Sequence, residues 1–255
     1  MFTTIVIILA AVVAGAINAI AGGGTLISFP ALMWAGRNAI VANATNCVAL
    51  WPGSFSAAYG YRRDMKTLPH WLLLLVLPAI LGASLGAWLL LRTPTKTFEH
   101  LVPILIFVAT VLVAVQNVIA QKLGVVAKAH EKPTAGWVTF VFVFQFIVAV
   151  YGGYFGAGMG ILMLAALGLI GLTDIHQMNG LKNLLAVCIN GVAAIYFGIN
   201  GAVAWRDGIL MAVGAIAGGY FGAMAAQKVG RRTVRVAVIV IGFLMTIALA
   251  IKTWG

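Results

Sequence analysis

Long apolar stretches follow one another along almost the whole chain, separated by short polar segments. Two of these stretches, residues 26–35 and 161–172, are short, and each follows a cluster of glycines. Eight others approach or exceed the roughly 20 apolar residues that a helix needs to cross a bilayer; they cover residues 3–20, 40–60, 71–91, 101–120, 137–154, 183–199, 208–226 and 234–251. This pattern predicts an all-α polytopic membrane protein with eight full transmembrane helices, two short or broken segments and no strand.

The second half of the chain repeats the first at a distance of 137 residues, so that residues 15–59 recur as residues 152–196. Internal symmetry of this kind is typical of transporters built from two homologous halves around a central site. We therefore predict a first repeat over residues 1–120, a cytoplasmic linker over residues 121–136 and a second repeat over residues 137–255.

Composition leaves no room for a soluble domain, because 63% of the residues are hydrophobic and only 8% are charged. The net charge of +11 does not predict nucleic-acid binding, because the charges fall in short loops and not on one patch. With residues 62–66 inside and each stretch counted as one crossing, the inside loops hold 11 Lys and Arg residues and the outside loops 5. That bias is typical of cytoplasmic loops.

The topology that follows from this count is an inverted repeat. Each half contains five crossings, and an odd number places the second half upside down relative to the first. If the short segments re-enter the membrane instead of crossing it, the two termini could change sides.

The glycine clusters are the first candidate for a binding site. Gly22, Gly23 and Gly24 precede Thr25, and Gly158 and Gly160 are their counterparts in the second half. Consecutive glycines interrupt a helix, and backbone groups freed inside a membrane need partners from a protein-lined cavity or a bound ion. A helix that restarts after the break points its positive dipole end at that cavity, which favours an anion. Close helix packing through small residues is the alternative interpretation.

Two asparagine pairs open long helices and form the second candidate. Asn43 and Asn179 are expected to be helix N-caps, a role that asparagine performs well. Asn46 and Asn183 lie about one turn further into their helices. A polar amide within a membrane span is costly and usually has a functional role. A role in substrate binding is therefore predicted for this second pair, with capping as the alternative.

Three further polar residues accompany these pairs. Thr45 and Lys182 occupy equivalent positions of the repeat, and Thr45 is included among the candidate substrate-binding residues. Lys182 would either offset the charge of an anion or mark a cytoplasmic helix end, and the second role is slightly favoured. Asn190 follows Asn183 by seven residues on the same helix face and is predicted to line a cavity. Gln145 would either face the cavity or form an interhelical hydrogen bond.

Residue types that many other functions require are missing from the predicted spans. All five acidic residues and all four histidines fall in loops or at helix ends. Intramembrane carboxylates serve as proton relays and cations prefer carboxylate oxygens, so a cation transporter is disfavoured. No catalytic constellation and no nucleotide or metal motif is present, and we expect neither enzyme activity nor a cofactor. Cys47 and Cys188 are expected to be buried free thiols.

The motifs around the glycine clusters resemble the sulfite exporter TauE/SafE family of bacterial inner-membrane proteins, and the resemblance covers nearly the whole chain. It rests on NAIAGGGTLISFPAL at residues 18–32, ANATN at 42–46, GGYFGAGMG at 152–160 and GLKN at 180–183. The family moves sulfur-containing anions, namely sulfite and organosulfonates. The resemblance thus implies a substrate site at Gly22 to Thr25, Asn46, Gly158, Gly160, Lys182 and Asn183. Ala157 and Met159 interrupt the second glycine run, so the two half-sites are not equivalent.

The leading hypothesis is a secondary transporter, an exporter of a small sulfur-containing anion, that works by alternating access in a bacterial inner membrane. An uncoupled anion channel and a non-transporting membrane partner protein are the alternatives. The expected partners are the anionic substrate and the lipid bilayer, and no nucleic acid. The small-residue face at Gly82 and Gly86 would suit a homodimer contact as well as packing within the chain.

Overall fold

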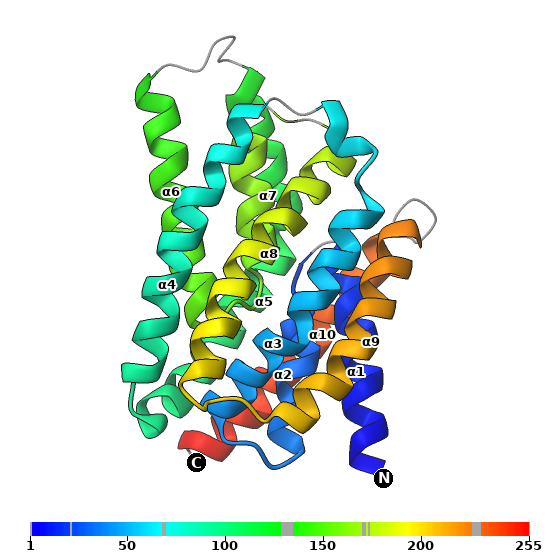
Figure 1. Ribbon diagram of the computed structural model, residues 1–255, viewed down its shortest axis with the longest axis vertical. Coiled ribbons are helices and arrows are strands. Elements are labelled where there is room, and N and C mark those ends of the chain that lie inside the picture. The colour runs from blue at the N-terminus through cyan, green and yellow to red at the C-terminus, as the bar shows by residue number, and fades with distance from the viewer. Residues whose placement is uncertain are drawn as a thin grey trace.

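The computed structural model describes residues 2–20, 22–67, 70–128, 135–169, 172, 174–225 and 231–254. In this part of the chain the structure consists of helices joined by turns and contains no strand, which confirms the predicted all-α class. Figure 1 shows a bundle of helices that run roughly along one axis, with both termini at the same end. The elements are α1 (Phe2–Ile20), α2 (Thr25–Trp34), α3 (Ala39–Gly60), the 3₁₀ turns η1 (Asp64–Thr67) and η2 (His70–Leu75), α4 (Val76–Arg92), α5 (Thr95–Lys128), α6 (Ala135–Tyr154), α7 (Met159–Leu169), α8 (Ile175–Ile199), α9 (Trp205–Ala225) and α10 (Arg231–Trp254).

Length and apolarity identify candidate membrane spans among these helices. Within the described residues five qualify, namely Thr3–Ile20, Leu73–Arg92, Thr95–Val115, Ile175–Ile199 and Trp205–Met224. Eight full spans were predicted, so not all of them qualify by these criteria. For example, α3 is 22 residues long, but its polar residues lower its mean hydropathy too far for it to qualify. The two short segments appear as α2, with 10 residues, and α7, with 11. Each extends about 15 Å, roughly half the hydrocarbon core of a bilayer.

The start of α8 differs from the sequence prediction. Asp174 caps the helix by accepting hydrogen bonds from two backbone N–H groups of its first turn, so α8 begins at Ile175. The polar segment between the apolar stretches 161–172 and 183–199, which the sequence places outside the spans, is therefore helical from Ile175 onwards. Lys182 lies inside the helix and is 2% exposed, so it does not mark a helix end. It therefore cannot be counted among the positive charges of the cytoplasmic loops.

The capping role predicted for Asn43 and Asn179 is also wrong. The N-cap of α3 is Asn38, whose side chain accepts a hydrogen bond from the N–H of Val41. Asn43 and Asn179 lie inside their helices and are buried. α3 starts at Ala39, next to the predicted start at residue 40, whereas α8 starts well before residue 183 because polar residues such as Gln177 and Asn179 occupy its first turns.

Helix also occupies part of the predicted linker. α5 continues to Lys128 and α6 begins at Ala135, while residues 129–134 lie outside the described residues.

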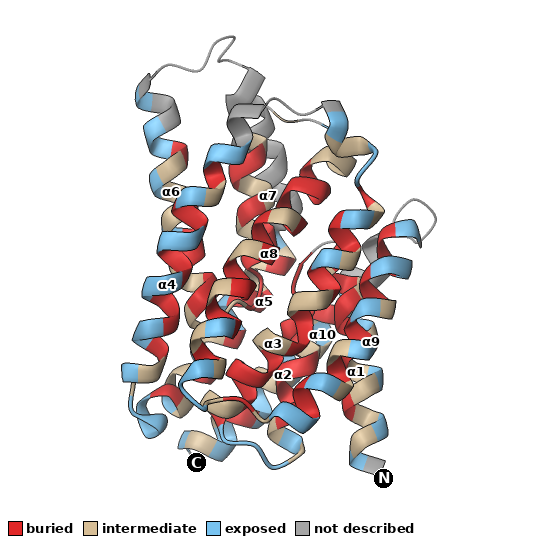
Figure 2. Cartoon of the chain, in the orientation of Figure 1, coloured by how far each residue is buried: buried red, intermediate tan, exposed pale blue. Residues whose placement is uncertain are grey.

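The helices of the two predicted halves make corresponding contacts. α1 packs against α9, and its counterpart α6 packs against α4. α3 packs against α9, and its counterpart α8 packs against α4. Two pairs of counterparts, α3 with α8 and α5 with α10, contact each other directly. α3 and α8 lie in the middle of the bundle (Figure 2), and both carry many buried residues.

Glycines make the α4–α6 and α1–α9 contacts close. A Cβ added at Gly82 or Gly86 would meet backbone oxygens of α6, and one added at Gly218 or Gly222 would meet the backbone of α1. These glycine faces are thus used for packing within the chain, the geometry expected where small residues let two helix backbones approach.

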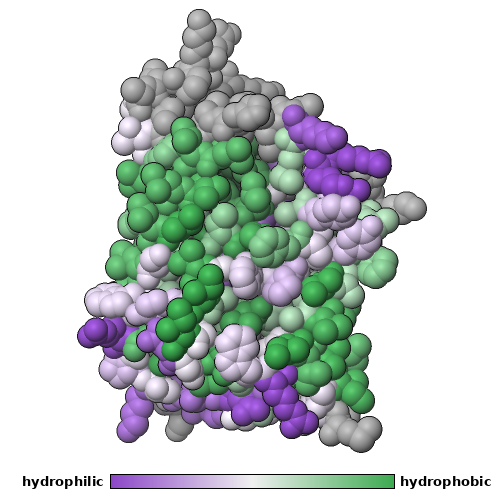
Figure 3. All heavy atoms as spheres, in the orientation of Figure 1, coloured by the Kyte–Doolittle hydropathy of each residue, from purple (hydrophilic) through white to green (hydrophobic). Residues whose placement is uncertain are grey.

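The outer surface is apolar along much of its height. Large exposed apolar side chains occur on α1, α4, α6, α9 and α10, and Figure 3 shows hydrophobic residues over most of one face, with hydrophilic ones gathered mainly towards its ends. Polar side chains such as Asn46, Gln145, Lys182 and Asn183 are buried instead. Apolar residues outside and polar residues inside are the arrangement of a multi-pass membrane protein.

Candidate functional site

The two breaks between helices meet near the centre of the molecule. Gly22 and Gly23, between α1 and α2, have φ angles of 77° and 106°, and Gly156 and Gly158, between α6 and α7, have φ angles of 78° and 74°. L side chains rarely adopt such angles, which explains the glycines. A Cβ at Gly22 would lie 2.9 Å from the Cα of Gly160. The two broken segments therefore touch backbone to backbone.

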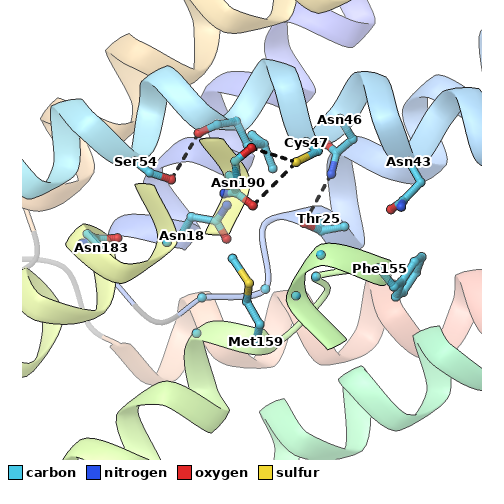
Figure 4. A pocket seen from close by; sticks show the side chains of 18 of the residues that line it. Asn18, Thr25, Asn43, Asn46, Cys47, Ser54, Phe155, Met159, Asn183 and Asn190 are labelled. Carbon is cyan, nitrogen blue, oxygen red and sulfur yellow. Dashed lines mark hydrogen bonds between the residues drawn. The ribbon is translucent and has the colours of Figure 1, made fainter. Parts of the chain in front are cut away.

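A small cavity of about 30 Å³ lies beside this contact, between the breaks and helices α3 and α8 (Figure 4). Its volume suits one or two water molecules. Nine side chains that can form hydrogen bonds line it: Asn18, Thr25, Asn43, Asn46, Cys47, Ser54, Lys182, Asn183 and Asn190.

Most of the residues predicted from the sequence are brought together here. Eight of them line the cavity: Gly22, Gly23, Thr25, Asn46, Gly160, Lys182, Asn183 and Asn190. Three do not. Gly24 donates its N–H to Asn18 Oδ1 at 2.7 Å, Thr45 Oγ1 accepts a hydrogen bond at 2.9 Å from the backbone N–H just before α9, and Gly158 packs against α5. These three residues support the break and the helix contacts around the cavity.

Side chains from each half cap the broken helix of the other half. Lys182 Nζ donates to the backbone oxygens of Asn18 at 2.7 Å and Ala19 at 3.4 Å, near the end of α1. Asn43 Nδ2 donates to the backbone oxygen of Tyr154 at 2.9 Å, the last residue of α6. Carbonyls at a helix C-terminus lack partners in their own helix and attract positive charge. Lys182 and Asn43 therefore stabilise the two helix ends that the breaks create.

Asn46 lies where α3 faces the start of α2. Its Nδ2 donates to Thr25 Oγ1 at 3.3 Å, and the residue is 3% exposed. Within the described part of the chain, Asn46 Oδ1 has no hydrogen-bond partner. A buried acceptor without a partner is rare in a folded protein and indicates an unseen water or ligand.

The opposite wall is formed by α8. Cys47 Sγ lies 3.5 Å from the backbone oxygen of Asn190 and 3.8 Å from its Oδ1, and donates to them, which links α3 to α8. Asn183 Nδ2 donates to the oxygen of Ala19 at 3.5 Å. Trp51 Nε1 donates to the oxygen of Val187 at 3.0 Å and adds a second link between the two helices.

The electrostatics of the cavity favour an anion. Among the described residues its lining holds one cationic side chain, Lys182, and no carboxylate. The helices α2 and α7 begin at Thr25 and Met159, and both residues line the cavity, so two positive helix ends lie at it. No group of metal-binding side chains occurs in the described ranges.

Some lining residues were not predicted from the sequence. Cys47, Leu50 and Ser54 line the cavity, and with Asn43 they follow the three- and four-residue spacing of one helix face. Extending that face from Asn43 would have found them. Phe155 and Met159 also line it, but only the position of the break indicates them. Gln145 is buried in α6 and is not among the lining residues.

Comparison with known proteins gives a family match over most of the chain. The family model described as "Sulfite exporter TauE/SafE" matches residues 7–249. This range includes both breaks and all the cavity residues named above.

Curated bacterial relatives are similar over nearly their whole length. A "Probable membrane transporter protein" of Haemophilus influenzae is 27% identical, covering 92% of this chain and 89% of the relative. The "Probable membrane transporter protein YfcA" of Escherichia coli is 28% identical, with coverages of 98% and 90%. The "Probable membrane transporter protein ORF9" of Sinorhizobium is 30% identical, with coverages of 95% and 89%. No solved structure matches the chain significantly.

Proposed function

Because the chain belongs to the sulfite exporter TauE/SafE family, we propose that it is a secondary transporter that exports a small sulfur-containing anion, sulfite or an organosulfonate. The names of the curated relatives, which describe membrane transporters, support the transport role. Their bacterial sources support a location in the bacterial inner membrane.

The observation that carries the proposal is the cavity where the two broken helices cross. It combines two helix N-termini, buried amides and a lysine, with no carboxylate among its described lining residues. Thr25, Asn46, Asn183 and Asn190 are the side chains proposed to hold the oxygens of the anion. Lys182 supplies positive charge at the same place while capping α1.

The mechanism proposed is alternating access between two inverted halves, residues 1–120 and 137–255. The corresponding contacts of the two sets of helices support it, as does the arrangement in which α3 and α8 contact each other beside the cavity. At about 30 Å³ the cavity is too small for an organosulfonate, so the halves must move apart before such a substrate enters.

Flux measurements in proteoliposomes test this function. Sulfite and a short organosulfonate are supplied with and without an imposed pH gradient, and a neutral solute serves as the control. Saturable anion flux that the gradient alters supports a coupled carrier. Flux that does not saturate and does not respond to substrate on the far side indicates the uncoupled channel. Folded protein that moves neither anion contradicts the proposed function and leaves the non-transporting partner protein.

Asn183 provides the first variant. Asn183→Ala removes an amide that lines the cavity and that, within the described residues, makes one long hydrogen bond, 3.5 Å to the backbone oxygen of Ala19. We expect several-fold lower flux with little change in the amount of folded protein, measured by size-exclusion chromatography in detergent. An equal loss of folded protein and of flux would assign Asn183 a structural role instead.

A further inference from the structure

Another pocket lies at the end of the bundle that carries both termini (Figure 1). It is formed by the end of α2, the start of α3, the first turns of α5 and the last turns of α10. Its volume is about 220 Å³, against about 30 Å³ for the central cavity. Ala39, Val102 and Leu249 are buried and form the apolar part of its lining. The pocket is therefore large enough for a small polar group attached to an apolar one.

The charged side chains of this pocket have opposite signs but do not neutralise each other. Glu99 on α5 and Lys252 in the last turn of α10 both line it. Within the described residues, neither side chain forms an ion pair. At the same end of the molecule Arg37 and Asp207 do pair, at 2.7 Å. Opposite charges that share a pocket without touching leave room for a ligand that carries both charges.

His100 adds an acceptor on the same helix as Glu99. Its Nδ1 lies 2.7 Å from the backbone oxygen of Lys96, and Nδ1 carries the hydrogen because a carbonyl oxygen can only accept. In the neutral ring Nε2 is then an acceptor. On the opposite wall, α10 offers donors, namely the Lys252 ammonium and the Thr253 hydroxyl. The acceptors thus lie on α5 and the donors on α10.

Exposed tryptophans place the pocket at a membrane interface. Two of them end the helices that form it and adjoin lining residues in the sequence, since Trp34 follows Met33 and Trp254 follows Thr253. Two more lie at the same end of the bundle, near the end of α4 and at the start of α9 (Figure 1). All four are at least 42% exposed: Trp34, Trp88, Trp205 and Trp254. Tryptophans are enriched where lipid headgroups meet the hydrocarbon core.

From this arrangement we propose that the pocket binds the zwitterionic headgroup of a phosphatidylethanolamine lipid. The ammonium of the headgroup donates to Glu99 and His100, and Lys252 donates to its phosphate. The acyl chains follow the outer face of α10, where Leu244 and Ile247 are exposed. The site is separate from the anion cavity and does not rest on the proposed transport function.

A matched pair of lipids isolates the contact with the ammonium. Phosphatidylethanolamine and phosphatidylcholine with identical acyl chains have the same net charge, but the trimethylated ammonium has no N–H group to donate. An equimolar mixture is added to the delipidated protein in detergent, and bound lipid is measured by native mass spectrometry. We expect roughly tenfold more bound phosphatidylethanolamine, the order expected for a hydrogen bond to a charged group. It should also raise the unfolding temperature more than phosphatidylcholine does.

Variants assign the preference to the pocket. Glu99→Met keeps the approximate size and removes the acceptor, so the ratio of the two bound lipids should fall several-fold. Lys252→Met removes the phosphate donor and should weaken binding of both lipids alike. Lys96→Met is the matched control, because it removes an exposed charge at the same end that does not line the pocket. Its lipid binding should equal that of the wild type.

Equal binding of the two lipids to the wild type overturns the proposal. A folded Glu99→Met variant that keeps the wild-type ratio overturns it as well, because the preference would then arise elsewhere on the surface. O-Phosphoethanolamine, which has the same headgroup and no acyl chains, should not displace the bound lipid when the two are equimolar. Displacement under that condition would assign the pocket to a soluble zwitterion instead. These measurements do not depend on transport, so their failure is distinct from a failure of the proposed function.

Discussion

Alanine substitutions at the crossing of the two breaks should destabilise the protein in a fixed order. At Gly22 two costs combine. The φ angle of 77° is unfavourable for alanine, by about 1–2 kcal/mol. The new Cβ would also lie 2.9 Å from the Cα of Gly160, and overpacking against backbone costs about 1–3 kcal/mol. Gly22→Ala should therefore destabilise the fold by about 2–5 kcal/mol.

Two other positions separate these costs. Gly23 has a φ of 106° but its Cβ would meet nothing closer than a side-chain methyl of Val113 at 3.5 Å, so Gly23→Ala should cost only the backbone strain. Gly160→Ala has no positive φ and places its Cβ 3.1 Å from the Cα of Gly22. It should cost only packing, partly offset by the roughly 1 kcal/mol that alanine gains over glycine inside a helix.

Thermal unfolding in detergent, followed by tryptophan fluorescence, gives the order. Gly22→Ala should have the lowest unfolding temperature of the three variants. The reasoning is refuted if Gly23→Ala is at least as destabilised as Gly22→Ala, or if Gly22→Ala unfolds at the temperature of the wild type. Either result would mean that the two breaks do not meet backbone to backbone.

Three further substitutions test other contacts. Lys182→Met removes the charged donor that caps α1, and thermal unfolding should show a loss of about 1.5–3 kcal/mol, the usual value of a charged hydrogen bond; unchanged stability would argue against the cap. Asp207→Asn weakens the 2.7 Å ion pair with Arg37, but the Arg37 side chain is 42% exposed, so the loss should stay below about 1 kcal/mol and shrink as salt is added. Gly86→Leu forces a side chain into the backbone of α6 and should abolish folded, monodisperse protein in size-exclusion chromatography, whereas a folded protein with an altered oligomeric state would place Gly86 at a subunit contact.

Apolar length predicted the helices well, because a bilayer imposes a minimum number of apolar residues on each span. The breaks were also predictable, since runs such as Gly22 to Gly24 interrupt a helix wherever they occur. The position of Lys182 was not. A polar residue that faces a neighbouring helix lowers the hydropathy of its segment as much as a residue in a loop does, and only the packing against α1 distinguishes the two cases.

The packing partners of individual residues were also beyond the sequence. Gly82 and Gly86 indicated a close helix contact, but many helices could have supplied it, and the structure assigns it to α6. The orientation of Asn46 depends on Thr25, 21 residues earlier, and no local pattern contains that pairing. Sequence reasoning thus found the residues of the cavity more reliably than the contacts that hold them.

Sulfite flux through the wild type and Gly160→Ala, both reconstituted in proteoliposomes, tests the central claim most directly. Gly160 lines the cavity, and an added Cβ contacts Gly22 and Lys182 with little expected cost in stability. If the crossing of the two breaks is the anion site, the wild type moves sulfite saturably and the folded variant moves it at least about tenfold more slowly. Equal flux through both proteins would contradict the claim that anions pass through this cavity.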